Sequence, residues 1–125
     1  HKSLSYKDKY FGGGMEYAAD FNSMFGYEPP YQSAESSAAL LVFKDAFERA
    51  NSFDTKKVRD ALAATDMQTF YGNIKFAPGG QNISKPMVLF QVICDDDGKC
   101  ENKVVAPLKW ASAELVHPIP SWSNR

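Results

Sequence analysis

The chain has 125 residues, of which 44% are hydrophobic and 14% aromatic, and its formal net charge at pH 7 is −1. This is enough material for one globular domain with a core, and too rich in aromatic residues for a disordered chain. The scattered basic residues argue against a nucleic-acid-binding surface, and no apolar run approaches the ~20 residues of a membrane-spanning helix.

The first part of the chain has the spacing of a helix between two breakers. From Met15 to Phe25, apolar residues recur at offsets of three and four, which predicts a helix with one apolar face. Gly26 is well placed to end it in the left-handed conformation. Before it, the glycines at 12–14 predict a hinge or cap, because no strand leads into them and no lysine follows as in a phosphate-binding loop. After it, the prolines of 28–30 predict an extended connector.

A longer helix is predicted at about 31–50. The apolar stripe that we expect along it comprises Ala39, Val42, Phe43, Ala46, Phe47 and Ala50. On the other side, Lys44 lies four residues before Glu48, and Asp45 has the same spacing from Arg49. Each such pair stabilises a helix by only about 0.2–0.5 kcal/mol.

A third helix is predicted from Thr55 to Ala64. Asp54 ends the preceding loop and can accept a hydrogen bond from a first-turn amide, which makes it a good N-cap. We expect Val58, Ala61 and Leu62 to form its buried edge. All three helices are amphipathic, so each needs a partner surface, and a sheet is the partner we expect.

From Thr69 onward the pattern is that of strands. Residues 87–93 alternate in direction and are mostly apolar on both faces, which predicts a strand covered on both sides. The run 95–99 is the clearest turn signal in the chain, and Val104-Val105 predicts the returning strand.

Two cysteines flank this turn symmetrically. If Cys94 faces Cys100, Asp95 pairs with Lys99 and the three-residue loop between them ends in Gly98. Such a loop requires a left-handed last residue, and glycine suits that position. A disulfide here would contribute roughly 2 kcal/mol at most on the chain-entropy model, and it would imply an oxidising compartment.

The alternatives to a disulfide are two reduced cysteines or a metal pair. Zinc would need further ligands, and His1 and His117 are both far away in the sequence. Neither histidine lies in a catalytic motif, and the aspartates at 95–97 lack the ligand spacing of a calcium loop. We therefore expect no catalytic residues, no metal and no cofactor.

Several short segments occur in a characteristic order. They are Gly26–Tyr31 with Ser33-Ala34, Asn51–Asp54 with Val58–Leu62, Phe70–Phe76, Gly80–Asn82, Gln91-Val92 and Pro118–Trp122. In this order they resemble the C-terminal portion of the extracytoplasmic solute-binding proteins of branched-chain amino acid ABC transporters, the leucine/isoleucine/valine-binding protein-like family. The resemblance runs from about Leu4 to Trp122.

The resemblance implies an α/β fold of the type I periplasmic-binding-protein kind, with two lobes joined by a three-stranded hinge. Residues 1–78 would give helices and a strand to lobe 1, residues 79–86 would cross the hinge, and residues 87–125 would form a hairpin and tail of lobe 2. The sheet that covers the helices would lie upstream. We therefore expect the remainder of the binding protein to accompany this chain, or the fragment to self-associate.

The resemblance also places ligand contacts at the start of the long helix, at Tyr31, Gln32 and Glu35. Tyr31 could stack on an apolar or aromatic ligand and hydrogen-bond through its hydroxyl, and the helix N-terminus could favour a carboxylate. The alternative is that Tyr31 only fixes the entry of the helix and that Glu35 is simply exposed.

The implied function is that of the substrate-binding component of an ABC importer. It would capture a small solute (a branched-chain or other amino acid, an amide or an aromatic acid) by lobe closure, in the periplasm or outside the cell. Its protein partner would be the membrane permease, and nucleic acid is not expected. The alternatives are a ligand-sensing domain of the same fold used in signalling, and a self-contained small α+β enzyme or interaction module.

Overall fold

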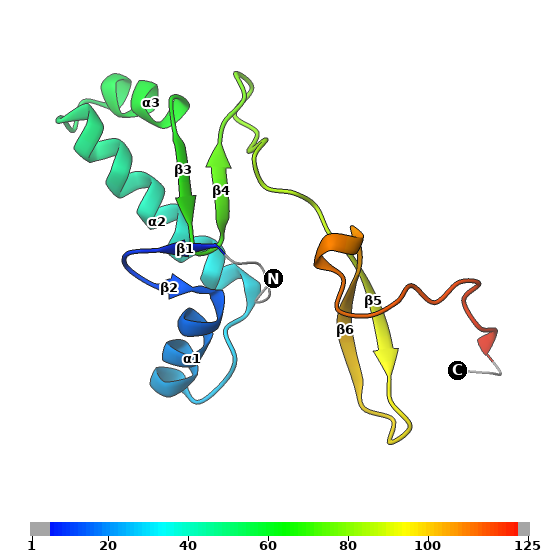
Figure 1. The fold of residues 1–125 in the computed structure, drawn as a ribbon. Coiled ribbons are helices and arrows are strands. Elements are labelled where there is room, and N and C mark those ends of the chain that lie inside the picture. Colours follow the sequence, from blue (N-terminus) through cyan, green and yellow to red (C-terminus); the bar gives the residue numbers. More distant parts are fainter. Residues whose placement is uncertain (1–5, 123–125) are drawn as a thin grey trace. The chain divides into compact units, whose positions relative to one another are not determined.

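The computed structural model describes residues 6–122, and its contacts divide the chain into two compact units at Pro86/Met87 (Figure 1). The first unit contains three helices and two small hairpins, and the second contains one hairpin followed by a short 3-10 helix. No helix in 6–122 combines the length and the apolar character that crossing a membrane requires.

The helices of the first unit are those that the sequence predicts. Their bounds are α1 Gly14–Phe25, α2 Tyr31–Ala50 and α3 Thr55–Ala63. The glycine run acts as a cap: Gly13 is the N-cap of α1, and its backbone N–H donates to the Glu16 carboxylate at 3.2 Å. Gly26 ends α1 in the left-handed conformation, with φ 79°, as predicted.

Two side chains fix α3 in place. The Asp54 carboxylate accepts a hydrogen bond from the Lys57 amide at 3.0 Å, which confirms the predicted N-cap. Arg49 reaches across from α2 and donates to the Ala61 carbonyl at 2.7 Å and to the Thr65 hydroxyl at 3.1 Å. The predicted ion pair of Arg49 with Asp45 is also present, at 2.7 Å. The Arg49 guanidinium therefore contacts both α2 and the end of α3.

The strands of the first unit form two antiparallel hairpins. Their bounds are β1 Lys7–Asp8, β2 Gly12–Gly13, β3 Asp66–Thr69 and β4 Gly72–Lys75, and β1 pairs with β2 and β3 with β4. The Asp8 carboxylate joins the two hairpins, because it accepts from the Phe70 amide at 2.7 Å. Mixed helices and small antiparallel sheets are consistent with a fragment of an α/β fold.

The core of the first unit is aromatic. Tyr17 of α1 stacks on Phe70 of the β3–β4 turn with ring centres 4.4 Å apart, and Ala38 and Leu41 of α2 complete the buried cluster. The helices are thus packed on a turn and on one another within this unit. The broad sheet expected as their partner is not formed by the described residues, whose sheets are all two-stranded.

The predicted apolar stripe of α2 is partly wrong. Val42 and Ala46 are buried as expected, but the other buried positions are Ala38 and Leu41, and Phe43 remains 46% exposed. The buried face is rotated by about one residue because Tyr17 of α1 and Phe70 of the β3–β4 turn form the core cluster with Ala38 and Leu41. Ala39, Phe43 and Phe47 of the predicted stripe remain exposed.

The second unit is built on the hairpin of β5 (Leu89–Cys94) and β6 (Cys100–Ala106), followed by η1 (Leu108–Trp110). Val104 and Val105 are buried. The expectation that β5 is covered on both sides is wrong within this structure, since Leu89 is 55% and Val92 64% exposed. The reason is that β5 has β6 as its partner strand and no layer packed over both of its faces.

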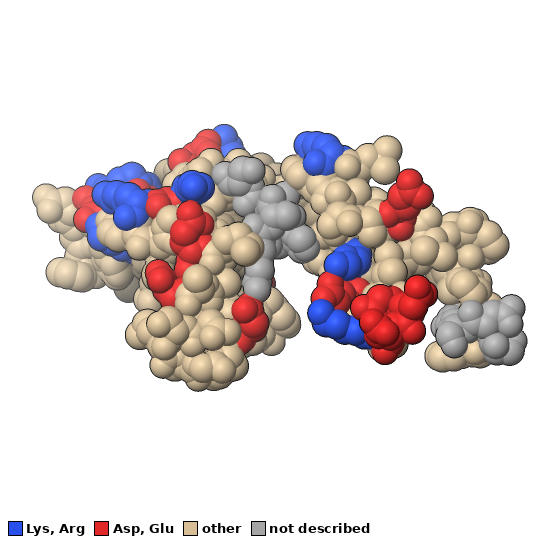
Figure 2. All heavy atoms as spheres, turned by 60° about the horizontal axis from the view of Figure 1, so that its bottom comes forward, with Lys and Arg blue, Asp and Glu red and all other residues tan. Residues whose placement is uncertain are grey.

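Charged side chains gather at the tip of this hairpin (Figure 2). The turn carries the acidic run 95–97, and Glu101 of β6 pairs with Lys99 at 2.9 Å and with Lys103 at 2.5 Å. Hydrogen bonds from Lys103 and Lys99 lower the pKa of the Glu101 carboxyl to about 2. The tip is therefore a mixed, solvated cluster of charges.

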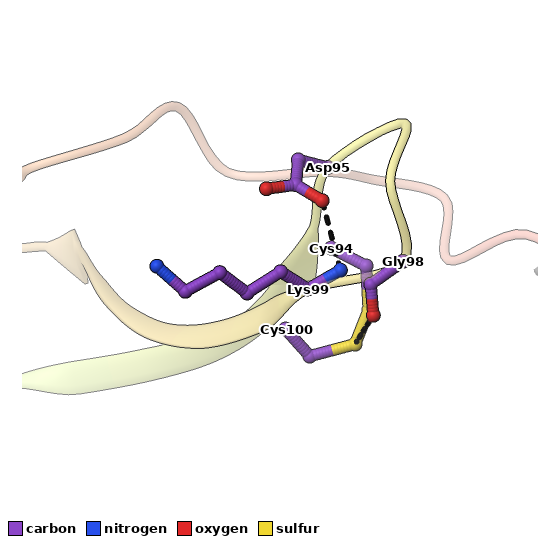
Figure 3. Close-up of a disulfide and its surroundings, with 5 residues drawn as sticks. All are labelled: Cys94, Asp95, Gly98, Lys99 and Cys100. Carbon is purple, nitrogen blue, oxygen red and sulfur yellow. Dashed lines mark hydrogen bonds between the residues drawn. A yellow bond between two sulfur atoms is a disulfide. The ribbon is translucent and has the colours of Figure 1, made fainter.

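The turn has the predicted register (Figure 3). Cys94 faces Cys100 and the two form a disulfide, and the Asp95 amide donates to the Lys99 carbonyl at 3.0 Å. Gly98 is left-handed with φ 79°, and the Lys99 amide donates to the Asp95 carboxylate at 2.8 Å (Figure 3). Cysteines at a non-hydrogen-bonded pair next to a closing hydrogen-bonded pair have their side chains close together, which favours bridging.

Candidate functional site

The start of α2 presents the predicted site residues to solvent. Pro30 is extended and is the N-cap of α2, and its carbonyl accepts from the Ser33 amide at 3.0 Å, which closes the first turn. Tyr31 is 67% exposed, and Gln32 and Glu35 are also exposed. The rigid Pro-Pro connector therefore sets these side chains at a defined point on the surface.

The structure does not bring the three residues into one hollow. Tyr31 lines a small hollow of about 190 Å³, Gln32 one of about 680 Å³, and Glu35 one of about 510 Å³. Tyr31 and Glu35 are four residues apart on one helix, so they share a face, while Gln32 points to another. Whether any of them binds a ligand stays a prediction.

The smallest hollow is walled by rings. Its lining includes Tyr17, Pro29, Pro30, Tyr31, Phe70 and Tyr71. Two of its walls, Tyr17 and Phe70, belong to the buried core of the unit, so their positions are fixed by packing. This surface can offer stacking contacts to an apolar or planar group, together with the hydroxyls of Tyr31 and Tyr71.

The hollow beside Glu35 is mainly apolar. It lies between α2, α3 and the β4 region, and its lining includes Val42, Phe43, Leu62, Ile74 and Phe76. Ala39, Val42 and Phe43 of the predicted α2 stripe all line this hollow.

Sequence reasoning missed two residues that contact this region. The Tyr71 hydroxyl donates to the Glu35 carboxylate at 2.7 Å, and the Lys85 ammonium lies 3.0 Å from the centre of the Tyr71 ring. Burial, and then the hydrogen bond to Glu35, raise the pKa of the Tyr71 hydroxyl, so it stays protonated as a donor. Burial lowers the pKa of the Lys85 amine, against an opposing effect of Glu35. No local pattern could have revealed these contacts, because the partners are far apart in the sequence.

Asn82 organises the segment between Tyr71 and Lys85. Its side chain accepts from the amides of Lys75 and Ser84, both at 3.1 Å, and donates to the Asn73 carbonyl at 3.2 Å. The segment thus folds back on β4, where Phe76 and Asn82 also form an isolated bridge.

The described part of the chain contains no group of three or more His, Cys, Asp or Glu side chains close enough to hold a metal ion. Both cysteines are bonded to each other. The region around Glu35 and Tyr31 therefore consists of aromatic rings, the loop held by the Asn82 side chain, and the opposite charges of Glu35 and Lys85.

One comparison with known proteins bears on these residues. A family model described as "Periplasmic binding protein" matches residues 6–99. The matched range includes all of the first unit's helices and strands, the start of α2, and the segment that carries Asn82 and Lys85. It ends within the disulfide-bridged turn of the second unit.

Proposed function

The chain belongs to the periplasmic binding protein family, and on that premise we propose that it is part of the substrate-binding component of an ABC-type importer. The family as a whole points to the binding of a small solute, to a location in the periplasm or outside the cell, and to a role without chemistry on the ligand. The importer, the permease as its partner and the kind of solute are our proposal.

The observation that carries this proposal is the match of the periplasmic binding protein family model over residues 6–99. The branched-chain amino acid group within that family is part of the proposal. The start of α2 supports it further, because Tyr31 is exposed beside a ring-lined hollow and Glu35 lies one turn further along. The proposed solute is a branched-chain or other amino acid, an amide or an aromatic acid, captured as two lobes close.

We assign residues 1–78 to lobe 1, residues 79–86 to a hinge crossing, and residues 87–125 to lobe 2. The division of contacts between Pro86 and Met87 supports a boundary at the end of the crossing. Open apolar surface on the first unit, at Phe43 and in the hollow beside Glu35, supports a further partner: the remainder of the binding protein would cover it.

Isothermal titration calorimetry on the full-length protein tests the function. We choose one probe for each class of solute: L-leucine, L-phenylalanine, acetamide and benzoate. Saturable binding of one of the four supports a solute-binding role, and its class narrows the choice. If none of the four binds, the proposed solute classes are wrong.

The Tyr31→Ala variant tests the site. We expect its affinity for the bound probe to fall by about tenfold or more, because a stacking ring and a hydroxyl are lost together. Tyr27→Ala is the matched control, since Tyr27 is also exposed and packs on Phe21 and Phe25 of α1. An unchanged dissociation constant in Tyr31→Ala would remove Tyr31 from the site.

A further inference from the structure

A chain of contacts joins three separate parts of the first unit. Glu35 lies in α2, Tyr71 in the two-residue loop between β3 and β4, and Lys85 just before the boundary at Pro86. The Tyr71 hydroxyl is 2.7 Å from Glu35 Oε1, and Lys85 Nζ is 3.0 Å from the centre of the Tyr71 ring. Tyr71 therefore uses its polar end and its face for two different partners.

The Tyr71 ring is held in place by its own turn. The buried Thr69 hydroxyl accepts from the Tyr71 amide at 3.2 Å and donates to the Gly72 carbonyl at 2.9 Å. The residue before Tyr71, Phe70, is buried in the core cluster. Since the backbone on each side of Tyr71 is fixed, its ring is a rigid platform.

The Lys85 side chain contacts the turn at two points, with its stem beside Gly72 and its ammonium over the Tyr71 ring. Its aliphatic stem lies over Gly72, where an added Cβ would come within 3.5 Å of Lys85 Cγ. Gly72 has φ 142°, a conformation that favours glycine. The stem is thus packed against backbone and the charged end against a ring, as expected of a long cationic side chain.

Among residues 6–122, no ion pair neutralises the charge of Lys85. Within residues 6–122 no carboxylate lies within salt-bridge distance of Lys85, and the nearby Glu35 carboxylate is hydrogen-bonded to Tyr71 instead. The partial burial that lowers the pKa of the Lys85 amine also strengthens its attraction to the ring, because cation–π contacts gain when water is excluded.

We propose that Tyr71 and Lys85 are positioning residues that couple the candidate ligand-binding end of α2 to the crossing segment 79–86. Tyr71 fixes the carboxylate of Glu35, and Lys85 fastens the segment to the same ring. A solute that binds Glu35 then changes the equilibrium between the anchored and the released state of segment 79–86. By linkage, anchoring of the segment changes the affinity for the solute by the same factor. The coupling to solute rests on the proposed function, whereas the anchoring of the segment does not.

Hydrogen–deuterium exchange of the ligand-free full-length protein tests the anchoring without any solute. We expect amides of 79–85 to exchange about fivefold faster in Lys85→Met, which keeps the stem and loses the charge. Lys85→Arg keeps a cation over the ring and should restore the wild-type rate. Lys109→Met is the matched control, because Lys109 makes the same kind of contact, 4.1 Å from the Trp110 ring centre. Equal exchange of 79–85 in Lys85→Met and wild type would overturn the proposal.

The Tyr71→Phe variant then tests the link to the solute. It keeps the ring and loses the hydroxyl, so exchange of 79–85 should stay near the wild-type rate while affinity for the bound probe falls about tenfold. In the double variant Tyr71→Phe/Glu35→Gln the loss should be no larger than in the worse single variant. Additive losses would show that Tyr71 does not act through Glu35. If no probe binds at all, the proposed function fails, and the exchange experiment still decides the anchoring.

Discussion

At the scale of single residues, several side chains of the first unit hydrogen-bond to irregular backbone near the candidate site. Asn82 makes three such bonds, and Asp8 accepts from the amides of Tyr10, Phe11 and Phe70. Each of these two side chains supplies hydrogen-bond partners to backbone groups that have no neighbouring strand to pair with. Losing one leaves several backbone groups unpaired at once, which costs more than losing a surface contact.

Asn82→Ala should therefore destabilise the full-length protein by about 1–3 kcal/mol, because the amides of Lys75 and Ser84 lose their acceptor. Urea unfolding followed by circular dichroism measures the change. Asn102→Ala, at an exposed position of β6, is the control and should stay within about 0.5 kcal/mol of wild type. Equal midpoints for the two variants would show that the Asn82 bonds contribute nothing to stability.

At the scale of elements, the β5–β6 hairpin is specified locally. Gly98 supplies the left-handed residue, Asp95 closes the loop through both its backbone and its carboxylate, and Cys94 and Cys100 bridge the strands next to it. The turn residues and the disulfide both favour the same register of β5 and β6. A short segment folds reliably when its local turn preferences and its cross-strand contacts favour the same structure.

The double variant Cys94→Ser/Cys100→Ser should lower the free energy of unfolding by roughly 2 kcal/mol at most, since the disulfide closes a short loop. Thermal unfolding with and without reductant measures it. The wild type should lose the same amount when reduced, and the double variant should not respond to reductant. A wild type that is insensitive to full reduction would contradict a stabilising role of the disulfide.

At the scale of the whole molecule, apolar surface is the dominant feature. Phe43 of the first unit and Leu89 and Val92 of the second are about half exposed or more, and the two units have separate sets of contacts. Exposed apolar patches of this kind mark surfaces that other protein normally covers. This is the property expected of a part of a two-lobed binding protein.

The isolated 125-residue chain should consequently self-associate and melt without a sharp transition. Gel filtration at several concentrations and a thermal melt measure both properties. A monomer that unfolds in one cooperative step would instead favour a self-contained small module, the third reading of the sequence.

The sequence by itself determined the three helices, the β5–β6 hairpin and the family, but not the short strands β1 and β2 that lead into α1. The bounds of α2, the N-cap Asp54, the left-handed Gly26 and the register around Gly98 all follow from side-chain chemistry within a few residues. The order of short segments from Gly26 to Trp122 was enough to indicate a periplasmic binding protein, and the family match covers residues 6–99.

The tertiary structure alone decided which faces are buried and which distant groups meet. Periodicity predicts the width of an apolar stripe, but the face that α2 buries depends on what packs against it. Leu41 is buried, whereas Phe43, which the periodicity predicted to be buried, is exposed. Tyr71 meets Glu35 across 36 positions of the chain. Contacts over such separations are set by the packing of whole elements, and no local pattern encodes them.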